Sequence, residues 1–311
     1  MKLLSLTLGL VVALIGCAAD SSQDFDYAKG FNPPAPRDGY HRYATAKVTV
    51  QPGENITYCE WIDVAPGTDV DIVDIQGFQS VTGHHAVLYS SSFNYAVGEN
   101  HECTVGDMVS IEFLGGIGGE GAMNPITLPD GYTFRQKQGR ALMANLHYLN
   151  TTDSPQEVQS VLDVKTASPQ VAHKAVGMAV INYLDFMIPA SPETYTINAS
   201  CTWPTDTSLF LWSNHMHEHG KSISAKFTKS DGADSMLAND VSWAPENAFN
   251  PVWSQWDVRT PTLIHAGDKV HISCSWNNTT GSPMMFPDEM CDGVGFYTES
   301  SETKICDATA D

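Results

Sequence analysis

Residues 141–148 read Ala-Leu-Met-Ala-Asn-Leu-His-Tyr, and residues 269–276 read Lys-Val-His-Ile-Ser-Cys-Ser-Trp. Both stretches have the length and apolar content of β-strands. Similar stretches recur at short spacing, at 47–50, 70–75, 85–89, 158–164, 209–212 and 222–227. Pro, Gly, Asn and Asp separate them, and strongly helix-periodic stretches are scarce. This pattern predicts an all-β protein built from sandwiches rather than from βαβ units.

The composition is that of a folded, acidic protein. The 311 residues include 16 Lys+Arg and 36 Asp+Glu, a formal net charge of −20, with 42% hydrophobic residues. A net-negative chain is repelled by nucleic acid and by anionic membrane surfaces, so we expect neither as a partner. The length allows two domains of about 150 residues. The best break lies at 167–172 and predicts domains at 37–168 and 169–308.

The N-terminus has the features of an export signal. A positive start is followed by an apolar run, residues 3–15, that is short for a membrane span. Leu14-Ile-Gly-Cys17 resembles a bacterial lipobox, which predicts a signal peptide over 1–16 and a lipid on Cys17. A flexible tether would follow over 17–36. We therefore expect a bacterial cell-envelope protein that meets the membrane only through this lipid; an ordinary secretory signal is the alternative.

The cysteine count agrees with export. Beyond Cys17, the chain has six cysteines: Cys59, Cys103, Cys201, Cys274, Cys291 and Cys306. An even number in an exported chain predicts three disulfides, in a pairing that the residues alone leave open. No CxxC pair occurs, which argues against a zinc ribbon or a thioredoxin-like site.

Three of the 11 histidines indicate a shared site in the first half. His84 and His85 are adjacent at the start of one predicted strand, and His147 lies inside another. Adjacent residues point to opposite faces of a regular strand, so His84 and His85 can share an ion only if the backbone is irregular at Gly83. His147 would have to come alongside through sheet pairing. The alternative is that these are ordinary core or surface histidines.

In the second half, His215-Met-His217 follows the predicted strand at 209–212. Residues two apart in an extended segment project from the same face, so His215 and His217 can bind one ion together. Known hydrolase signatures fail: Gly220 follows His217-Glu-His219, so there is no HExxH, and no GxSxG occurs.

Taken in order, these motifs resemble the copper type II, ascorbate-dependent monooxygenases, which include peptidylglycine α-hydroxylating monooxygenase and dopamine β-monooxygenase. The likeness extends from about Thr57 to Cys306. Its motifs are Cys59, His84-His85, Cys103, Leu128-Pro-Asp-Gly131, Phe134-Arg135, Leu146-His147-Tyr148, Cys201, His215-Met-His217, Gly220-Lys221, Ala248-Phe-Asn-Pro251, Gly267-Asp268 and Asp288-Glu-Met-Cys291.

The resemblance implies two tandem antiparallel jelly-roll-like β-sandwich domains with one copper on each. The first copper would store and deliver an electron, and the second would bind O₂ where the substrate is hydroxylated. The matching ligands are His84, His85 and His147 for the first copper, and His215, His217 and Met290 for the second. The implied disulfides are Cys59–Cys103, Cys201–Cys306 and Cys274–Cys291.

The ligand chemistry agrees with these roles. Two imidazoles and a thioether form a soft set that favours Cu(I), whereas three imidazoles serve both oxidation states. Met290 taken alone would be a core methionine, but a Cys274–Cys291 bond would fix its position through its immediate neighbour.

Departures from the family pattern bear on the substrate. Where peptide-amidating members grip a carboxylate, this chain has Ser213, Asp292 and Val294, which disfavours peptide amidation and favours a neutral or cationic small substrate. The Gly-rich stretch 115–121 lacks the Lys-Ser/Thr of a phosphate loop and is interpreted as a mobile loop. His101 receives no role, and His219 is interpreted as solvent-exposed.

The leading hypothesis is an exported, lipid-anchored copper monooxygenase that uses O₂ and an external reductant such as ascorbate, with electrons crossing a gap between the domains. The competing hypothesis is a copper-binding or copper-storage lipoprotein without catalysis. A third, a carbohydrate-binding sandwich, would need exposed Trp203, Trp253 and Trp256, which are better explained as core or interdomain packing. The sequence indicates neither the identity of the substrate nor the oligomeric state.

Overall fold

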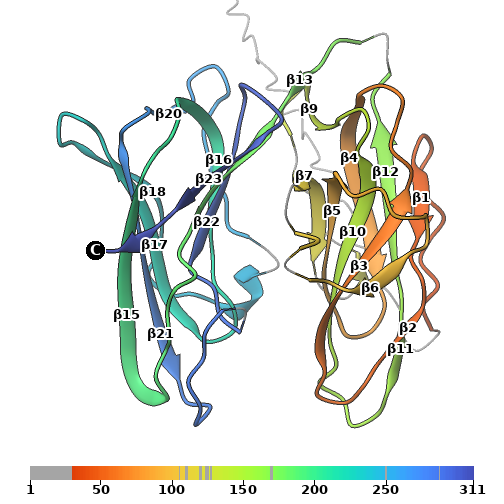
Figure 1. Cartoon of the computed structure of the whole chain (residues 1–311), viewed down its shortest axis with the longest axis horizontal. Helices are drawn as coiled ribbons and strands as arrows, with labels where there is room; N and C mark the ends of the chain where they lie inside the picture. Colours follow the sequence, from red (N-terminus) through yellow and green to blue (C-terminus); the bar gives the residue numbers. More distant parts are fainter. Residues whose placement is uncertain are drawn as a thin grey trace, which may run out of the picture.

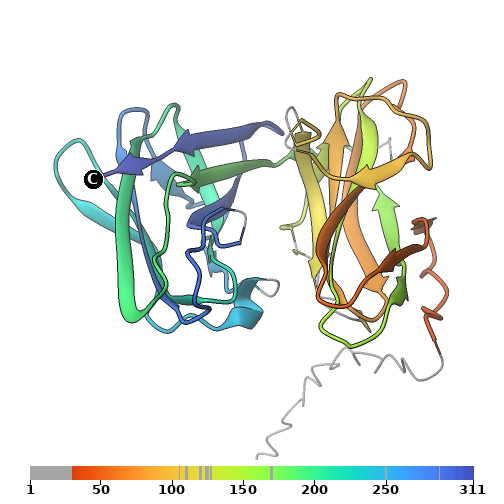
Figure 2. The same ribbon diagram turned by 60° about the horizontal axis from the view of Figure 1, so that its bottom comes forward.

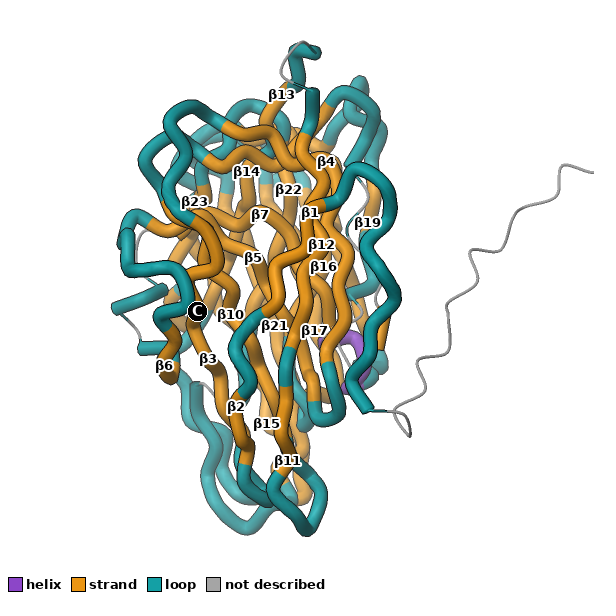
Figure 3. The backbone as a smooth tube through the Cα atoms, turned by 90° about the vertical axis from the view of Figure 1, so that its right-hand side faces the viewer, coloured by secondary structure: helices purple, strands orange, loops and turns teal. Residues whose placement is uncertain are grey.

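The structure is a computed structural model that describes residues 30–311, apart from 105, 109, 110, 119, 120, 123–125, 127, 169, 170, 249, 250 and 287. The described residues form strands, loops and one 3-10 helix, η2 (Pro245–Ala248), so the all-β prediction is confirmed (Figure 3). The signal peptide, Cys17 and most of the expected tether lie outside the described residues. In the part of the chain that is described, no helix has the length and apolar character needed to cross a membrane.

The first half forms a β-sandwich (Figure 1). One sheet has the order β1 (His41–Ala44), β12 (Ser160–Thr166), β4 (Val70–Gln79), β9 (Tyr132–Gln136) and β13 (Lys174–Ala175), with β8 (Gly121–Ala122) paired to β4. The other has the order β6 (Asn100–Glu102), β3 (Asn55–Asp63), β10 (Ala141–Leu149), β5 (Gly83–Ser91) and β7 (Ile111–Gly118). A two-stranded ribbon joins β11 (Gln156–Val158) to β2 (Val48–Val50).

The second half forms another sandwich beside the first. Its first sheet has the order β19 (Ser254–Gln255), β16 (Thr207–His215), β22 (Asp292–Tyr297), β14 (Gly177–Asn182) and β23 (Thr303–Asp307), with β20 (Thr262–Ile264) paired to β16. Its second has the order β18 (Asp234–Asp240), β17 (Gly220–Thr228), β21 (Lys269–Asn278), β15 (Ser191–Thr202) and β24 (Thr309–Ala310). Among the described strands, pairing is antiparallel except for two parallel pairs, β13 with β9 and β14 with β23. Figure 2 shows β14 (green) and β23 (dark blue) running together.

Strand periodicity explains how residues 141–148 and 269–276 become part of the hydrophobic core. In β21 every second residue is buried, so that Val270, Ile272 and Trp276 face the interior of the second sandwich. β10 is the central strand of its sheet and is buried on both faces over most of its length. All eight predicted strands overlap observed ones, although 158–164 is divided at Gln159 between β11 and β12.

The interpretation of 115–121 as a mobile loop is wrong for its first part. Residues 115–118 belong to β7 and pair with β5, from Leu88↔Gly115 to His85↔Gly118. A Cβ on Gly115, whose φ is +143°, would lie 2.5 Å from Cδ1 of Ile75. The glycine therefore lets the strand approach the opposite sheet closely, which a composition-based interpretation cannot detect.

An aromatic contact joins the two sandwiches. Phe296 of β22 lies with its ring centroid 5.4 Å from those of both Phe113 and Phe134 of the first sandwich. β13 follows the expected break but pairs with β9, so the connecting segment is held on the first sandwich. β24 lies just beyond the predicted end at 308 and completes the second. The two halves are thus held face to face along one side of each.

Three disulfides are present, Cys59–Cys103, Cys201–Cys306 and Cys274–Cys291. They are the same pairs that the family resemblance implies. The first lies in the first sandwich and the other two in the second, so none crosses between the halves.

Candidate metal centres

Sheet pairing brings His84, His85 and His147 together, and we call them the first cluster. β10 pairs with β5 so that His147 stands directly opposite His85. One ligand atom from each of the three side chains lies within 4.8 Å of the others. Nδ1 of His84 is 3.2 Å from Nδ1 of His85. Three imidazole nitrogens that converge in this way fit a copper or another transition metal that accepts nitrogen ligands.

A backbone irregularity allows the two adjacent histidines to share this site. The register shifts after His147↔His85, because Tyr148 pairs with Gly83 and His84 is left as the extra residue of a bulge. Thr82, just before it, has a positive φ of 66°. A Cβ on Gly83 would lie 2.4 Å from the Cβ of Gln79, so only glycine fits at this turn.

Two polar side chains hold the first cluster in place. Gln79 of the opposite sheet donates from Nε2 to the carbonyls of His85 (3.1 Å) and His147 (3.4 Å). Nε2 of His147 lies 2.5 Å from Oδ1 of Asn55, a carbonyl oxygen that can only accept. Nε2 therefore carries the hydrogen, and Nδ1 of His147 has the free lone pair for a metal.

Burial keeps the first cluster neutral. Desolvation lowers the pKa of His84 to about 4 and that of His147 to about 3, and lowers the pKa of His85 well below its usual value. Neighbouring histidines add to each shift by charge repulsion. Uncharged imidazoles at neutral pH are the form that binds metal.

We call the candidate ligands His215, His217 and Met290 the second cluster. β16 ends at His215 and β22 begins at Asp292, and these two residues pair, so His217 and Met290 each lie two residues beyond this last pair. The ring centroids of His215 and His217 are 5.2 Å apart. Desolvation is the largest cause that lowers the pKa of His215 to about 3, and the charge on His217 follows.

The buried carboxylate of Glu289 ties the methionine segment to the histidine segment. It accepts hydrogen bonds from the backbone N–H of His217 (3.0 Å) and of His219 (2.6 Å), and from Nε1 of Trp276 (2.9 Å). On the other side of Met290, Cys291 is bonded to Cys274. The methionine is therefore held between two fixed neighbours.

A hydrogen bond also sets the tautomer of His217 in the second cluster. Nδ1 of His217 lies 3.1 Å from the carbonyl oxygen of Asp288, so Nδ1 carries the hydrogen and Nε2 has the free lone pair. The charge on His217 lowers the pKa of His84 and of His147. The two clusters therefore face each other within electrostatic range.

Ser213, Asp292 and Val294 lie on the sheet face that continues from the second cluster. Asn182, Asp292 and His215 form one row across β14, β22 and β16, and Val180, Val294 and Ser213 form the next row on the same face. Asp292 is 6% exposed, its Oδ1 has no hydrogen-bond partner among the described residues, and burial raises its pKa to about 8. A buried acid without a partner is costly, which marks this row as functional rather than structural.

Other residues named from the sequence take structural positions. Nε2 of His101 donates to the carboxylate of Asp107 at 3.1 Å, and its ring stacks on Trp61, away from both clusters in the pairing of β6 with β3. His219 is half-buried rather than fully exposed. Trp203 is 1% exposed, and Trp253 and Trp256 pack against the cores, which removes the exposed tryptophan face that a carbohydrate site would need.

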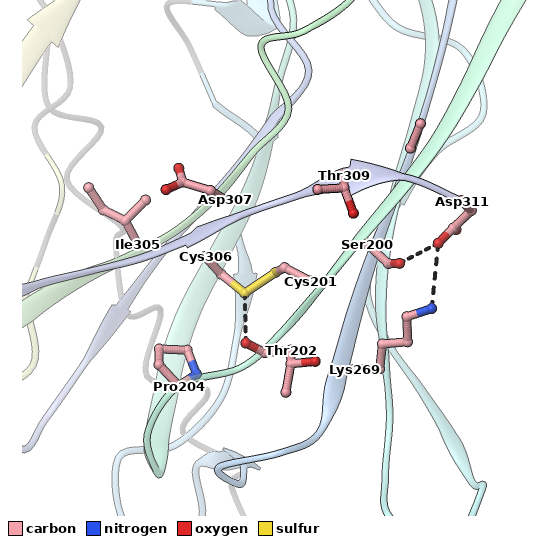
Figure 4. A pocket seen from close by; sticks show the side chains of 11 residues that line it. Ser200, Cys201, Thr202, Pro204, Lys269, Ile305, Cys306, Asp307, Thr309 and Asp311 are labelled. Carbon is pink, nitrogen blue, oxygen red and sulfur yellow. Dashed lines mark hydrogen bonds and ion pairs between the residues drawn. A yellow bond between two sulfur atoms is a disulfide. The ribbon is translucent and has the colours of Figure 1, made fainter.

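A pocket of about 720 Å³ lies in the second sandwich, beside the Cys201–Cys306 bond (Figure 4). Ser200 and Lys269 both contact Asp311 at its rim. None of its lining residues belongs to either cluster. This pocket is therefore separate from the candidate metal chemistry.

Comparison with known proteins supports copper in the second half. Residues 174–311 match the family model described as copper type II ascorbate-dependent monooxygenase, C-terminal domain. This match includes the second cluster, and the family that it names is copper-dependent. No curated protein matches the chain. For residues before 174, the resemblance depends on the motifs and on the geometry of the first cluster.

Solved structures add only distant likenesses. PNGase F, a glycosylasparaginase from Flavobacterium meningosepticum, aligns with a TM-score of 0.40 and 12% identity over 88% of this chain and 100% of that chain. The major capsid protein P2 of bacteriophage PM2 aligns with a TM-score of 0.33 and 6% identity over 83% of this chain and 97% of that chain. Scores this low carry no argument about the function of this chain.

Three residues that position the ligands were missed by sequence reasoning. Sequence reasoning gives no role to Asn55 or Gln79, and it includes Glu289 only within the motif Asp288-Glu-Met-Cys291. Glu289 offered the one usable signal, an acid beside a candidate ligand. The other two act across strand pairings that only the fold shows.

Proposed function

We propose that this protein is a copper monooxygenase that uses O₂ and a one-electron reductant such as ascorbate to hydroxylate a C–H bond of a small substrate. The observation that carries the proposal is the pair of unlike clusters that face each other. One has three neutral imidazoles, and the other has two imidazoles, with Met290 two residues beyond the same strand pair, within the region that the family model matches. Storage of copper alone would not require two chemically different sites.

His84, His85 and His147 would hold one copper, and His215, His217 and Met290 would hold the other. Bound copper would supply the one-electron transfer and the activation of O₂. The chain itself keeps the imidazoles neutral by burial and aims their lone pairs through the hydrogen bonds of Asn55 and of the Asp288 carbonyl. Glu289 and the Cys274–Cys291 bond hold the thioether beside the histidines.

The substrate would lie on the face formed by the rows of Asp292 and Val294. Two valines, Val180 and Val294, offer an apolar surface, and burial raises the pKa of Asp292 to about 8, so its side chain would be mostly uncharged at neutral pH. This arrangement offers no positive charge to a carboxylate, so it supports a neutral small molecule rather than a peptide with a free carboxyl end. We also propose export and anchoring through a lipid on Cys17, for which fatty-acid labelling that is lost in Cys17→Ser is the test.

Oxygen uptake in the presence of ascorbate tests the central proposal. The protein is loaded with copper and freed of unbound metal, and the surface variant His265→Ala serves as a control. We expect uptake that depends on protein-bound copper, persists in the control and is lost in His147→Ala and in Met290→Ala. Copper binding without such uptake would instead establish a binding or storage protein.

A further inference from the structure

Two loops of the second sandwich meet beside the second cluster. The backbone N–H of Ile188 donates to the carbonyl of Met284 (2.8 Å), and the N–H of Met284 donates to the carbonyl of Ile188 (3.0 Å). Both side chains are buried, at 0% and 6% exposed. This is a hydrogen-bonded antiparallel pair, so the residues on either side of it project from the opposite, outer face.

Met187 and Met285 are the flanking residues on that outer face. The register that pairs Ile188 with Met284 places Met187 opposite Met285, and they are 58% and 49% exposed. Positions next to a hydrogen-bonded pair bring side chains closest across two antiparallel strands. This register therefore gives two exposed methionine side chains facing positions, and we call them the methionine pair.

The methionine pair is joined to the second cluster by a rigid scaffold. The N–H of Glu289 donates to the carbonyl of Met285 (3.2 Å), which closes one turn directly before Met290. Trp276 stacks on Phe186, with ring centroids 5.2 Å apart, and donates to the carboxylate of Glu289. Both loops are thus tied around one buried tryptophan that also supports the second cluster.

The chemistry of the pair selects its ligand. Thioethers are soft, polarisable ligands that prefer Cu(I) to hard cations and to Zn(II). Asp185 and Asp288, both exposed, lie in the same two loops and favour the approach of a cation. Methionine is not required at an exposed surface position, where an aliphatic or polar side chain would serve equally well. Among the described residues, only one further methionine, Met236, is comparably exposed.

We propose that the methionine pair is a Cu(I) capture site that receives copper from a donor molecule and supplies it to the second cluster. Two thioethers leave the coordination of Cu(I) incomplete, so the donor provides the remaining ligand until transfer. No electron moves in this step, since copper enters and leaves as Cu(I). The inference rests on the proposed copper chemistry of the second cluster.

The test is anaerobic titration of the apo-protein with Cu(I) against the chelator bicinchoninate, followed by X-ray absorption. Wild type is compared with Met187→Leu/Met285→Leu, which conserves side-chain volume, and with the matched control Met236→Leu. We expect wild type and the control to bind a third, weaker equivalent of Cu(I) with sulfur ligation. The double variant should lack this equivalent and should load the second cluster about tenfold more slowly.

The failures of the two proposals are distinguishable. A double variant that binds and loads Cu(I) like wild type overturns the capture site but not the proposed role of the two clusters. This holds even if the methionine pair proves to bind a protein. The same loss in Met236→Leu would also overturn it. Failure of the histidine clusters to bind copper in any variant would instead reject the proposed function.

Discussion

The two clusters are built in opposite ways. In the first, the ligands lie within paired strands β5 and β10, and Asn55 fixes the hydrogen on Nε2 of His147. In the second, the ligands lie at and beyond the ends of β16 and β22, and a carbonyl fixes the hydrogen on Nδ1 of His217. Sheet register therefore sets the first cluster, and a braced loop sets the second.

This difference agrees with the proposed roles. A site held by strand pairing and by Gln79 has little freedom to rearrange, which suits the repeated gain and loss of one electron. A site with a flexible thioether on a loop can adjust its coordination while its histidines stay fixed. The braces, Glu289 and the Cys274–Cys291 bond, limit how far that loop can move.

Removing one ligand from each cluster should give the largest effects and divide the roles. Met290→Ala should remove the sulfur ligand and weaken Cu(I) binding only at the second cluster, while His147→Ala should impair only the first. Each should lower oxygen uptake at least about 100-fold, more than the loss of a supporting residue would. Copper stoichiometry and X-ray absorption measure this. Loss of both coppers in either single variant would contradict the separation of the clusters.

Glu289→Ala should show how much the supporting carboxylate contributes to the second cluster, because it removes no candidate ligand. It leaves three N–H donors without their acceptor, one of them buried and two partly buried, so we expect a loss of about 3 kcal/mol in the free energy of unfolding. Copper at the second cluster should be lost while the first cluster still binds. Glu218→Ala, an exposed acid in the same segment, is the control and should change neither property. Denaturant unfolding and metal analysis are the measurements, and equal loss of copper at both clusters would be the contrary outcome.

The same difference explains what the sequence could predict. Periodicity and turn residues identified the strands of β10 and β21, because burial of alternate residues is a local pattern. The motifs named all six candidate ligands, because histidine, methionine and cysteine are rare and their order along the chain is informative. The sequence showed only that an irregular backbone at Gly83 is needed for His84 and His85 to share an ion. The structure has a bulge there, and Gln79 of the other sheet leaves no room for a side chain on Gly83.

What could not be predicted depends on contacts between distant segments. Asn55 is 92 positions from His147 and reaches it only because β3 pairs with β10. The strand character of Gly115 depends on the space beside Ile75, not on its own propensity. The Ile188–Met284 pair that exposes the methionine pair is likewise invisible without the fold.

Asn55→Ala should weaken the first cluster without removing a ligand. Without the acceptor, His147 can place its hydrogen on either nitrogen, so copper affinity at this cluster should fall about tenfold. ¹⁵N NMR of the apo-protein should show the loss of the Nε2–H tautomer, which a general loss of stability would not produce. Asn55→Asp should keep the tautomer. Thr57→Val is the control, because Thr57 lies directly opposite His147 and no described hydrogen bond involves its side-chain hydroxyl. Copper affinity and the tautomer should stay unchanged in this variant. A wild-type tautomer in Asn55→Ala would refute this role.

Acid should destabilise the apo-protein mainly through the first cluster. Burial lowers the pKa of His84 to about 4, that of His147 to about 3 and that of His85 still further below its usual value. In the unfolded chain these groups titrate near 6.5, so below that pH the unfolded state binds more protons and stability falls. Most carboxylates titrate below pH 5, which leaves pH 5–7 to the histidines. We expect the Tm to fall by at least about 5 °C from pH 7 to pH 5.

The second cluster should contribute less to this acid sensitivity. Its lowered pKa is that of His215, at about 3, whereas burial raises the pKa of Asp292 to about 8. A raised carboxyl pKa has the opposite sign, because the folded state then binds more protons than the unfolded state and loses stability as the pH rises toward 8. Asp292 thus offsets His215 within pH 5–7. Asp292→Asn should therefore steepen the rise of Tm from pH 5 to pH 7, whereas His84→Gln should flatten it, and an unchanged slope in Asp292→Asn would show that Asp292 does not offset His215.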